Sequence, residues 1–240
     1  MKIFLDSASV KDIREAMSWG AIDGITTNPS LIAKEGREFA GLIREICEVV
    51  GGPVSAETVS RDAEGMVREG KQLAAVHPDV IVKCPLTKEG LKTTRALSAQ
   101  QIRVNVTLCF SATQALMAAK AGAYYISPFI GRLDDVSQDG MELIEQIRTI
   151  YDNYKFSTQI LAASIRHPIH VVQAACIGAD IATMPMSVLE TLIKHPLTDI
   201  GLERFLKDWD TLPPEAKQFT LSAEATASRK SAAKTAGHRS

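Results

Sequence analysis

The sequence predicts a single (β/α)8 barrel followed by one extra helix and a flexible tail. Short β-rich segments recur along the chain, each is followed by a longer stretch, and eight such units fit into about 210 residues. The strands are expected at Lys2–Leu5, Gly24–Thr27, Pro53–Glu57, Val80–Lys83, Arg103–Thr107, Ala123–Ile126, Thr158–Leu161 and Ile181–Met184. Parallel strands joined by right-handed crossovers close readily into a barrel. A doubly wound open sheet is the alternative, but no G-x-G-x-x-G follows the first strand, which weakens its dinucleotide-binding form.

Helices are expected between these strands. The segments Asp62–Val76 and Gly140–Tyr151 place apolar residues at helical spacing. Helix start signals stand at Ser9, Thr87 and Ser111, since a hydroxyl oxygen accepts hydrogen bonds from N–H groups of the first turn.

The end of the chain is predicted to differ from the rest. We expect a barrel domain over residues 1–211 and a flexible tail over 212–240, which is rich in Ala and Ser and low in large apolar residues. The last helix, Thr198–Asp210, is amphipathic and carries Phe205 and Trp209. Because the barrel is already complete, this helix must cover apolar surface on its own barrel or on a neighbouring subunit.

Composition indicates a soluble cytoplasmic globule. The 27 basic and 28 acidic residues give a net charge of −1, with 45% apolar residues. Nucleic-acid and membrane-surface binders carry a basic excess, so neither partner is expected. No apolar run is long enough to span a membrane, and the first residues do not resemble a secretory signal. The four cysteines lie far apart, which favours reduced thiols in the cytoplasm.

No metal site and no cofactor are expected. Of the five histidines, only His167 and His170 are close in sequence, and no nearby carboxylate completes a ligand set. Neither a Walker-type loop nor a G-x-S-x-G motif occurs.

Polar residues stand where the predicted strands end. In a (β/α)8 barrel the reactive groups lie at the carboxyl ends of the strands. The candidates there are Asp6, Thr26, Asn28, Glu57, Lys83, Asn105, Thr107, Phe129, Ser164 and Arg166.

Lys83 is the sharpest candidate because it follows Val80–Val82 inside an apolar strand. Burial disfavours the ammonium form and should lower its pKa from the reference of about 10.4. A desolvated lysine amine is what Schiff-base chemistry on a carbonyl substrate requires. The alternative is a structural lysine paired with Asp6 or Glu57.

The other candidates fit roles around such a lysine. Asp6 and Glu57 are either acid–base groups or counter-ions, and Asn28 and Thr107 are suited to hydrogen bonds with substrate hydroxyls. Arginine binds oxyanions through two hydrogen bonds, and barrels often bind phosphate near their later loops.

Arg132, Ser164 and Arg166 therefore form a predicted phosphate clamp. For each arginine the alternative is a surface salt bridge, for instance of Arg132 with Asp134 or Asp135.

Seven ordered segments resemble the transaldolase family, most closely its small-subunit branch, which includes the fructose-6-phosphate aldolases. The likeness covers roughly residues 1–211. The segments are LDSA (5–8), GITTNPSLIAKEG (24–36), VSAET (54–58), IVKCPLTKEGLK (81–92), NVTLCFS (105–111), SPFIGRLDD (127–135) and AASIRHP (162–168).

The resemblance implies a Schiff base on Lys83, acid–base catalysis by Asp6, and a catalytic water held by Glu57 and Thr107. It implies substrate binding by Asn28 and phosphate binding by Arg132, Ser164 and Arg166. We add Thr26, Asn105 and Phe129 to the expected substrate-binding residues.

The implied reaction moves a dihydroxyacetone unit from a ketose phosphate, sedoheptulose 7-phosphate or fructose 6-phosphate, to an aldose phosphate in the pentose phosphate pathway. The alternative is an aldolase that releases free dihydroxyacetone, but aldolases of the branch have Tyr and Gln at the positions of Phe129 and Glu57. A non-catalytic sugar-phosphate sensor and a structural oligomer are weaker rivals. The resemblance also implies a homo-oligomer, in related proteins often a decamer of two pentamers.

Overall fold

The computed structural model describes residues 1–217, which lie in two compact units, Met1–Ile193 and a second that begins at Lys194. The predicted tail falls mainly on 218–240, outside the described residues.

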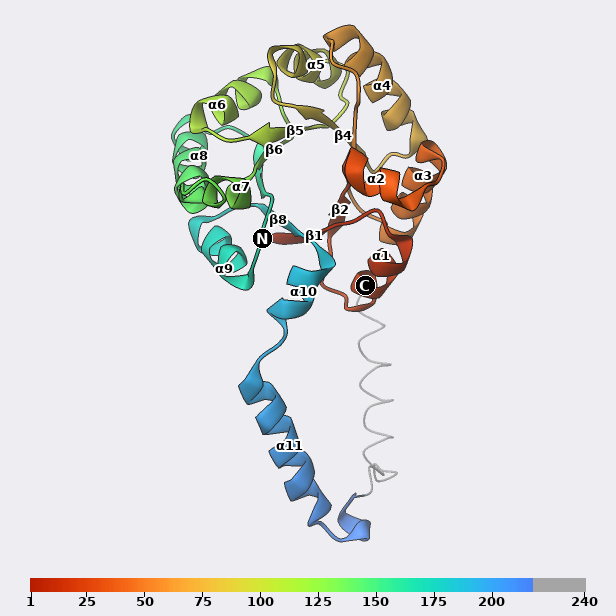
Figure 1. Ribbon diagram of the computed structural model, residues 1–240, viewed down its shortest axis with the longest axis vertical. Helices are drawn as coiled ribbons and strands as arrows, with labels where there is room; N and C mark the ends of the chain where they lie inside the picture. The colour runs from red at the N-terminus through yellow and green to blue at the C-terminus, as the bar shows by residue number, and fades with distance from the viewer. Residues whose placement is uncertain (218–240) are drawn as a thin grey trace, which may run out of the picture. The chain divides into compact units, whose positions relative to one another are not determined.

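The first unit contains a closed barrel of eight parallel strands in sequential order, ringed by helices (Figure 1). The strands are β1 (Lys2–Asp6), β2 (Gly24–Thr26), β3 (Val54–Glu57), β4 (Val80–Pro85), β5 (Val104–Cys109), β6 (Tyr125–Pro128), β7 (Gln159–Ala162) and β8 (Ile181–Met184). Each lies at its predicted place, so the (β/α)8 prediction is confirmed and the open sheet is wrong.

The helices of the first unit are α1 (Val10–Ser18), α2 (Pro29–Glu35), α3 (Phe39–Val50), α4 (Ala63–Val76), α5 (Lys88–Ser98), α6 (Ala112–Ala121), α7 (Ile130–Asp134), α8 (Gly140–Tyr154), α9 (Pro168–Ile177) and α10 (Met186–Leu192). The predicted start signals at Ser9, Thr87 and Ser111 are confirmed, since each side chain accepts a hydrogen bond from an N–H group of its helix. The short helix α7 was not predicted. Of its five residues, Arg132 lines a cavity at the carboxyl ends of the strands, whereas Ile130 and Leu133 are buried in the core.

Two apolar layers hold the barrel together. A large layer fills the space between strands and helices and includes Ile25, Val82, Ile126 and Ile144. A smaller one inside the barrel is formed by Phe4, Ile81, Tyr125, Leu161, Ala163 and Ile181. In a (β/α)8 barrel such side chains fill the interior, and ligands bind at the carboxyl ends of the strands.

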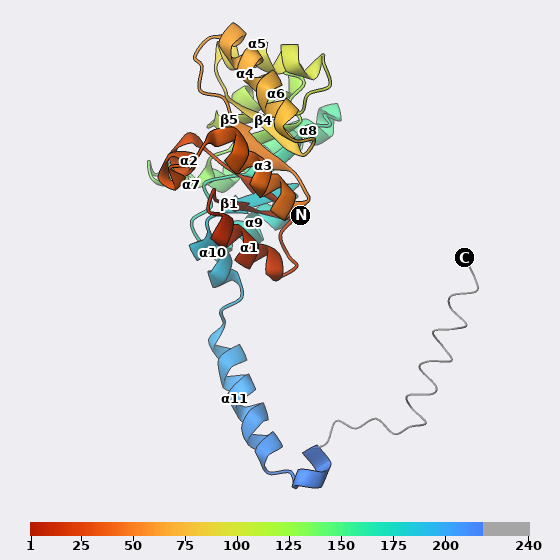
Figure 2. The same cartoon turned by 90° about the vertical axis from the view of Figure 1, so that its right-hand side faces the viewer.

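The mouth lies at the end where α2 and α7 are found, and the N-terminus lies at the other end of the barrel (Figure 2). Within residues 1–217, no helix has the length and apolar character needed to cross a membrane.

The second unit contains α11 (Pro196–Asp210) and a 3-10 turn, η1 (Pro214–Lys217). The helix starts two residues before the predicted Thr198, because Pro196 fits the first turn and His195 Nδ1 accepts the N–H of Leu197. No residue of α11 is buried.

Candidate active site

A cavity of about 540 Å³ opens at the carboxyl ends of the strands. Every predicted site residue except Asn105 lines it, and those residues come from β1 to β7 and the loops that follow. This convergence follows from the parallel closed topology, which brings eight strand ends to one rim.

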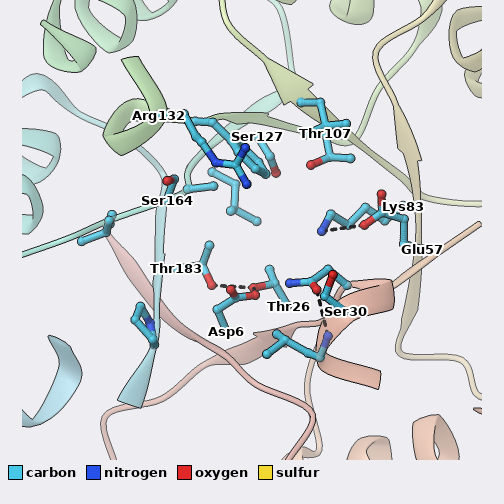
Figure 3. Close-up of a pocket in the computed structure, with 18 of the residues that line it drawn as sticks. Asp6, Thr26, Ser30, Glu57, Lys83, Thr107, Ser127, Arg132, Ser164 and Thr183 are labelled. Atoms are coloured by element: carbon cyan, nitrogen blue, oxygen red, sulfur yellow. Dashed lines mark hydrogen bonds and ion pairs between the residues drawn. The ribbon is translucent and has the colours of Figure 1, made fainter. Parts of the chain in front are cut away.

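Lys83 projects from β4 into this cavity (Figure 3). Its side chain is nearly buried, and the residue is 5% exposed. The Nζ atom lies 3.0 Å from Glu57 Oε2 and donates a hydrogen bond of 2.9 Å to the carbonyl oxygen of Thr27. Glu57 is the register partner of Lys83 on β3, so of the two possible counter-ions the structure selects Glu57.

Asp6 lies at the end of β1 and accepts a 2.8 Å hydrogen bond from Thr26 Oγ1. That hydroxyl lies 2.7 Å from Thr183 Oγ1, so a chain of two hydroxyls ends on the carboxylate. Burial raises the pKa of Asp6, although the Thr26 hydrogen bond and the charge of Lys83 oppose the rise. A carboxyl with a raised pKa is suited to acid–base work near neutral pH.

Thr107 faces the cavity from β5, and its hydroxyl is buried with no hydrogen-bond partner among the described residues. Beyond it the ladder between β5 and β6 is irregular, and Leu108 adopts a left-handed backbone with φ of 60°. A buried hydroxyl aimed into a polar cavity is suited to bind a water or a substrate oxygen.

The residues of the predicted phosphate clamp come from helix α7 and from the loop after β7. Arg132 lies on α7, whereas Ser164 and Arg166 follow β7, and all three line the cavity. The N–H of Gly131 donates to the carbonyl oxygen of Ser164 at 3.2 Å. A Cβ at Gly131 would lie 2.2 Å from that oxygen, so the close approach of the two segments requires glycine.

The salt bridge proposed as an alternative for Arg132 is wrong for that residue. In the described part of the chain, Arg132 makes no ion pair. The alternative holds for Arg166, which forms a surface salt bridge of 2.7 Å with Asp135 and also lines the cavity. Figure 3 shows Arg132 pointing into the pocket from the side opposite Lys83.

Two of the amide candidates have structural contacts. Asn28 lines the cavity while its Oδ1 caps α2 by accepting the N–H of Leu31 at 3.0 Å. Asn105 does not line the cavity; it is fully buried and bridges Ser55 and Ser127.

Sequence reasoning missed Thr183, which lines the cavity; Ser127, a polar residue at the end of the sixth strand, lines it as well. Thr183 had a usable signal, because it is the polar residue in the apolar strand Ile181–Met184. Within residues 1–217, no three His, Cys, Asp or Glu side chains come together as metal ligands.

The chain is similar to known proteins of one family. The sequence profile described as transaldolase/fructose-6-phosphate aldolase matches residues 3–236. A probable transaldolase of Aquifex aeolicus is 62% identical over 213 residues, covering 89% of this chain and 98% of the relative. One from Caldicellulosiruptor saccharolyticus is 60% identical over 214 residues, covering 89% of this chain and 99% of the relative.

Solved structures with low identity support the fold. A structure described as native KDPGal has a TM-score of 0.56 at 16% identity and covers 77% of this chain and 82% of its own. The resemblance predicted from the motifs is confirmed: the chain belongs to the transaldolase/fructose-6-phosphate aldolase family and is an enzyme of the transaldolase type.

Proposed function

We propose that this enzyme moves a dihydroxyacetone unit from a ketose phosphate to an aldose phosphate through a Schiff base on Lys83. The observation that carries the proposal is the nearly buried amine of Lys83 facing a polar cavity, 3.0 Å from a carboxylate. Glu57 accepts the proton of Lys83, directly or through water, and the neutral amine attacks the C2 ketone of the substrate.

Imine formation requires protons to move to and from the carbinolamine oxygen before water leaves. Glu57 and Thr107 face the same cavity, and the Thr107 hydroxyl has a free hydrogen-bonding capacity there. We assign them to the water that relays these protons.

Asp6 then takes the proton of the C4 hydroxyl, and the C3–C4 bond breaks. The bond electrons pass to the protonated imine, which becomes an enamine of dihydroxyacetone on Lys83, and an aldose phosphate leaves. Addition of the acceptor aldose phosphate reverses these steps. The raised pKa of Asp6 supports this role, since the carboxyl must hold the proton in one half-reaction and return it in the other.

Arg132, Ser164 and Arg166 bind the phosphate of donor and acceptor alike. Two guanidinium groups from neighbouring loops suit a dianionic oxyanion. Anchoring the phosphate fixes the distance between the reacting carbons and Lys83. Thr26, Asn28 and Phe129 line the remaining surface for the sugar chain, while the buried Asn105 accepts the hydroxyl proton of Ser127 and holds that side chain in the cavity lining.

The test is borohydride trapping. The protein is incubated with fructose 6-phosphate and borohydride, and intact mass and peptide mapping locate the reduced adduct. We expect a dihydroxyacetone adduct on Lys83 and none in Lys83→Ala, whose turnover should fall by at least about a thousandfold. Lys92→Ala is the control, because Lys92 is an exposed lysine paired with Glu89.

An adduct on another lysine, or turnover of Lys83→Ala within tenfold of the parent, would contradict the proposal.

Turnover with and without an acceptor aldose phosphate then separates the two reactions of the family. We expect turnover to require the acceptor, because Phe129 and Glu57 differ from the Tyr and Gln of the aldolases.

We further propose a homo-oligomer in the cytoplasm, acting in the pentose phosphate pathway. Helix α9 leaves Ile169 63% and Val172 61% exposed one turn apart, and α11 carries exposed Leu202 and Phe205. Such faces suit a second copy of the chain. The molar mass measured by light scattering should be a multiple of 26.0 kDa. The double variant Ile169→Lys/Val172→Lys should have a lower molar mass, because two charges interrupt the apolar face. A monomeric parent would contradict the oligomer.

A further inference from the structure

A buried histidine contacts both segments that carry the phosphate clamp, helix α7 and the loop after β7. His170 lies in the first turn of α9 and is 6% exposed. Its Nδ1 accepts the backbone N–H of Arg166 at 3.3 Å, and its Nε2 lies 3.0 Å from Asp134 Oδ2. Because Nδ1 accepts a hydrogen bond, the proton of the neutral ring must be on Nε2, which donates to Asp134.

The two partners of His170 belong to the two halves of the clamp. Asp134 is the last residue of α7, the helix that carries Arg132. Its other oxygen accepts the N–H of Gly140 at 3.0 Å, so the carboxylate is held from both sides. His170 therefore connects the end of α7 to the backbone of Arg166.

We propose that His170, in its neutral Nε2–H form, is a positioning residue that sets the distance between Arg132 and Arg166. Protonation of Nδ1 would place two donors against each other and release the backbone of Arg166. Binding of phosphorylated substrates would then weaken as His170 becomes charged. The inference rests on the proposed role of Arg132 and Arg166 as the phosphate site.

The charged groups around His170 and its burial determine the pH at which its ring becomes charged. Asp134 on α7 and Asp139 at the start of α8 favour the charged ring, whereas burial and His167 disfavour it. The ring of His167 stacks on that of His170 with centroids 3.8 Å apart, and Arg166 presents its backbone N–H. The balance lowers the pKa of His170 from its usual 6.5, with burial as the largest cause. The neutral ring therefore persists at pH 7, and it becomes charged only at a pH below its usual pKa of 6.5.

Three variants test the proposal. His170→Gln keeps a donor and an acceptor but cannot titrate, and His170→Leu removes both. His77→Gln is the matched control, since His77 Nδ1 also accepts a backbone N–H, that of Asp79, and His77 does not line the cavity. KM and kcat are measured with fructose 6-phosphate and with unphosphorylated fructose between about pH 7.5 and 5.5, a range that spans the usual histidine pKa.

We expect His170→Leu to raise KM for fructose 6-phosphate about tenfold, with kcat and the constants for fructose within about twofold. In the parent and in His77→Gln, KM for fructose 6-phosphate should rise more steeply towards acid than in His170→Gln. The phosphate group of the substrate also titrates near pH 6. Because this titration is the same for every variant, the ratio of the variant's KM to the parent's KM at each pH isolates the effect of His170.

Parallel pH profiles of the parent and His170→Gln would overturn the proposal. So would equal losses for both substrates in His170→Leu, which would indicate a structural role alone. Arg166→Ala is measured alongside. If it fails to discriminate between the two substrates, the phosphate site itself is wrong; if it discriminates and the His170 variants do not, only the positioning role fails. The pH profile of His170→Gln decides the question even if His170→Leu does not fold.

Discussion

The Nζ atom of Lys83 lies 3.0 Å from Glu57 Oε2, whereas Asp6 in the same cavity receives its hydrogen bond from the hydroxyl of Thr26. The two carboxylates thus have different surroundings. Glu57 is paired with an ammonium group, and Asp6 lies at the end of a hydroxyl chain that begins at Thr183. Different surroundings allow two carboxyl groups in one site to take different protonation roles.

The ion pair predicts a specific pattern of stability. Glu57→Leu leaves the Lys83 ammonium buried without its carboxylate, which should lower the free energy of unfolding by about 3 kcal/mol. Lys83→Met/Glu57→Leu removes both charges and should recover most of that loss. Urea unfolding of the two single variants and the double variant gives the coupling free energy. Strictly additive losses would show that the pair contributes nothing to stability.

The hydroxyl chain predicts a role for Thr183 in carbon–carbon cleavage. A hydroxyl that donates to Thr26 directs the Thr26 proton towards Asp6 and strengthens that hydrogen bond. Thr183→Val should slow cleavage about tenfold while borohydride still traps the adduct on Lys83, and Thr183→Ser should retain the parent rate.

The control for this loss of a hydroxyl is Thr191→Val, because Thr191 is exposed on α10 and bonds only to its own helix. Single-turnover rates with fructose 6-phosphate are the measurement. Identical cleavage rates for Thr183→Val and the parent would exclude a role for the chain.

Arg166 should discriminate between substrates by their phosphate. Its guanidinium lines the cavity and is held by Asp135 at 2.7 Å. Arg166→Ala removes a charge-assisted contact, which is worth about 1.5–3 kcal/mol, so kcat/KM for fructose 6-phosphate should fall by about tenfold to a hundredfold more than for fructose. Arg204→Ala, on the exposed surface of α11, controls for the loss of one positive charge. Equal losses for both substrates would reject the clamp.

The sequence predicted the barrel and most of its rim because both depend on local patterns. The alternation of short strands and helices fixes the parallel order, and that order alone brings Asp6, Glu57 and Lys83 to one end of the barrel. The choice of Glu57 over Asp6 as the partner of Lys83 needed the strand register, which the hydrophobic pattern does not specify for a strand buried on both faces.

The sequence did not predict contacts between side chains on elements that are far apart along the chain. The sequence shows His167 and His170 without a nearby carboxylate, yet the fold brings Asp134 from α7 to within 3.0 Å of His170. That contact depends on α7, a helix of five residues, too short to leave a periodic signal. Asn105 shows the opposite error: it was predicted to bind substrate, but its side chain is fully buried and bridges Ser55 and Ser127.

The ionised form of Asp6 should lower the free energy of unfolding at neutral pH. Burial raises its pKa above the usual 3.8, so the native state binds the proton more tightly than the unfolded state does. Stability from this group is therefore complete in acid, below the usual pKa, and is lost as the pH rises through the raised native pKa. Asn does not titrate and its amide oxygen can still accept the hydrogen bond of Thr26.

Asp6→Asn should therefore have a higher unfolding midpoint than the parent at pH 7, and the difference should shrink as the pH falls towards about 4. Turnover should fall by about a hundredfold to ten-thousandfold, since proton transfer from the C4 hydroxyl is lost, while the adduct on Lys83 still forms. Thermal unfolding across this pH range and borohydride trapping at pH 7 make the two measurements. A variant that is less stable than the parent at pH 7 would mean that ionised Asp6 stabilises the fold, and its raised pKa could not then explain its acid–base role.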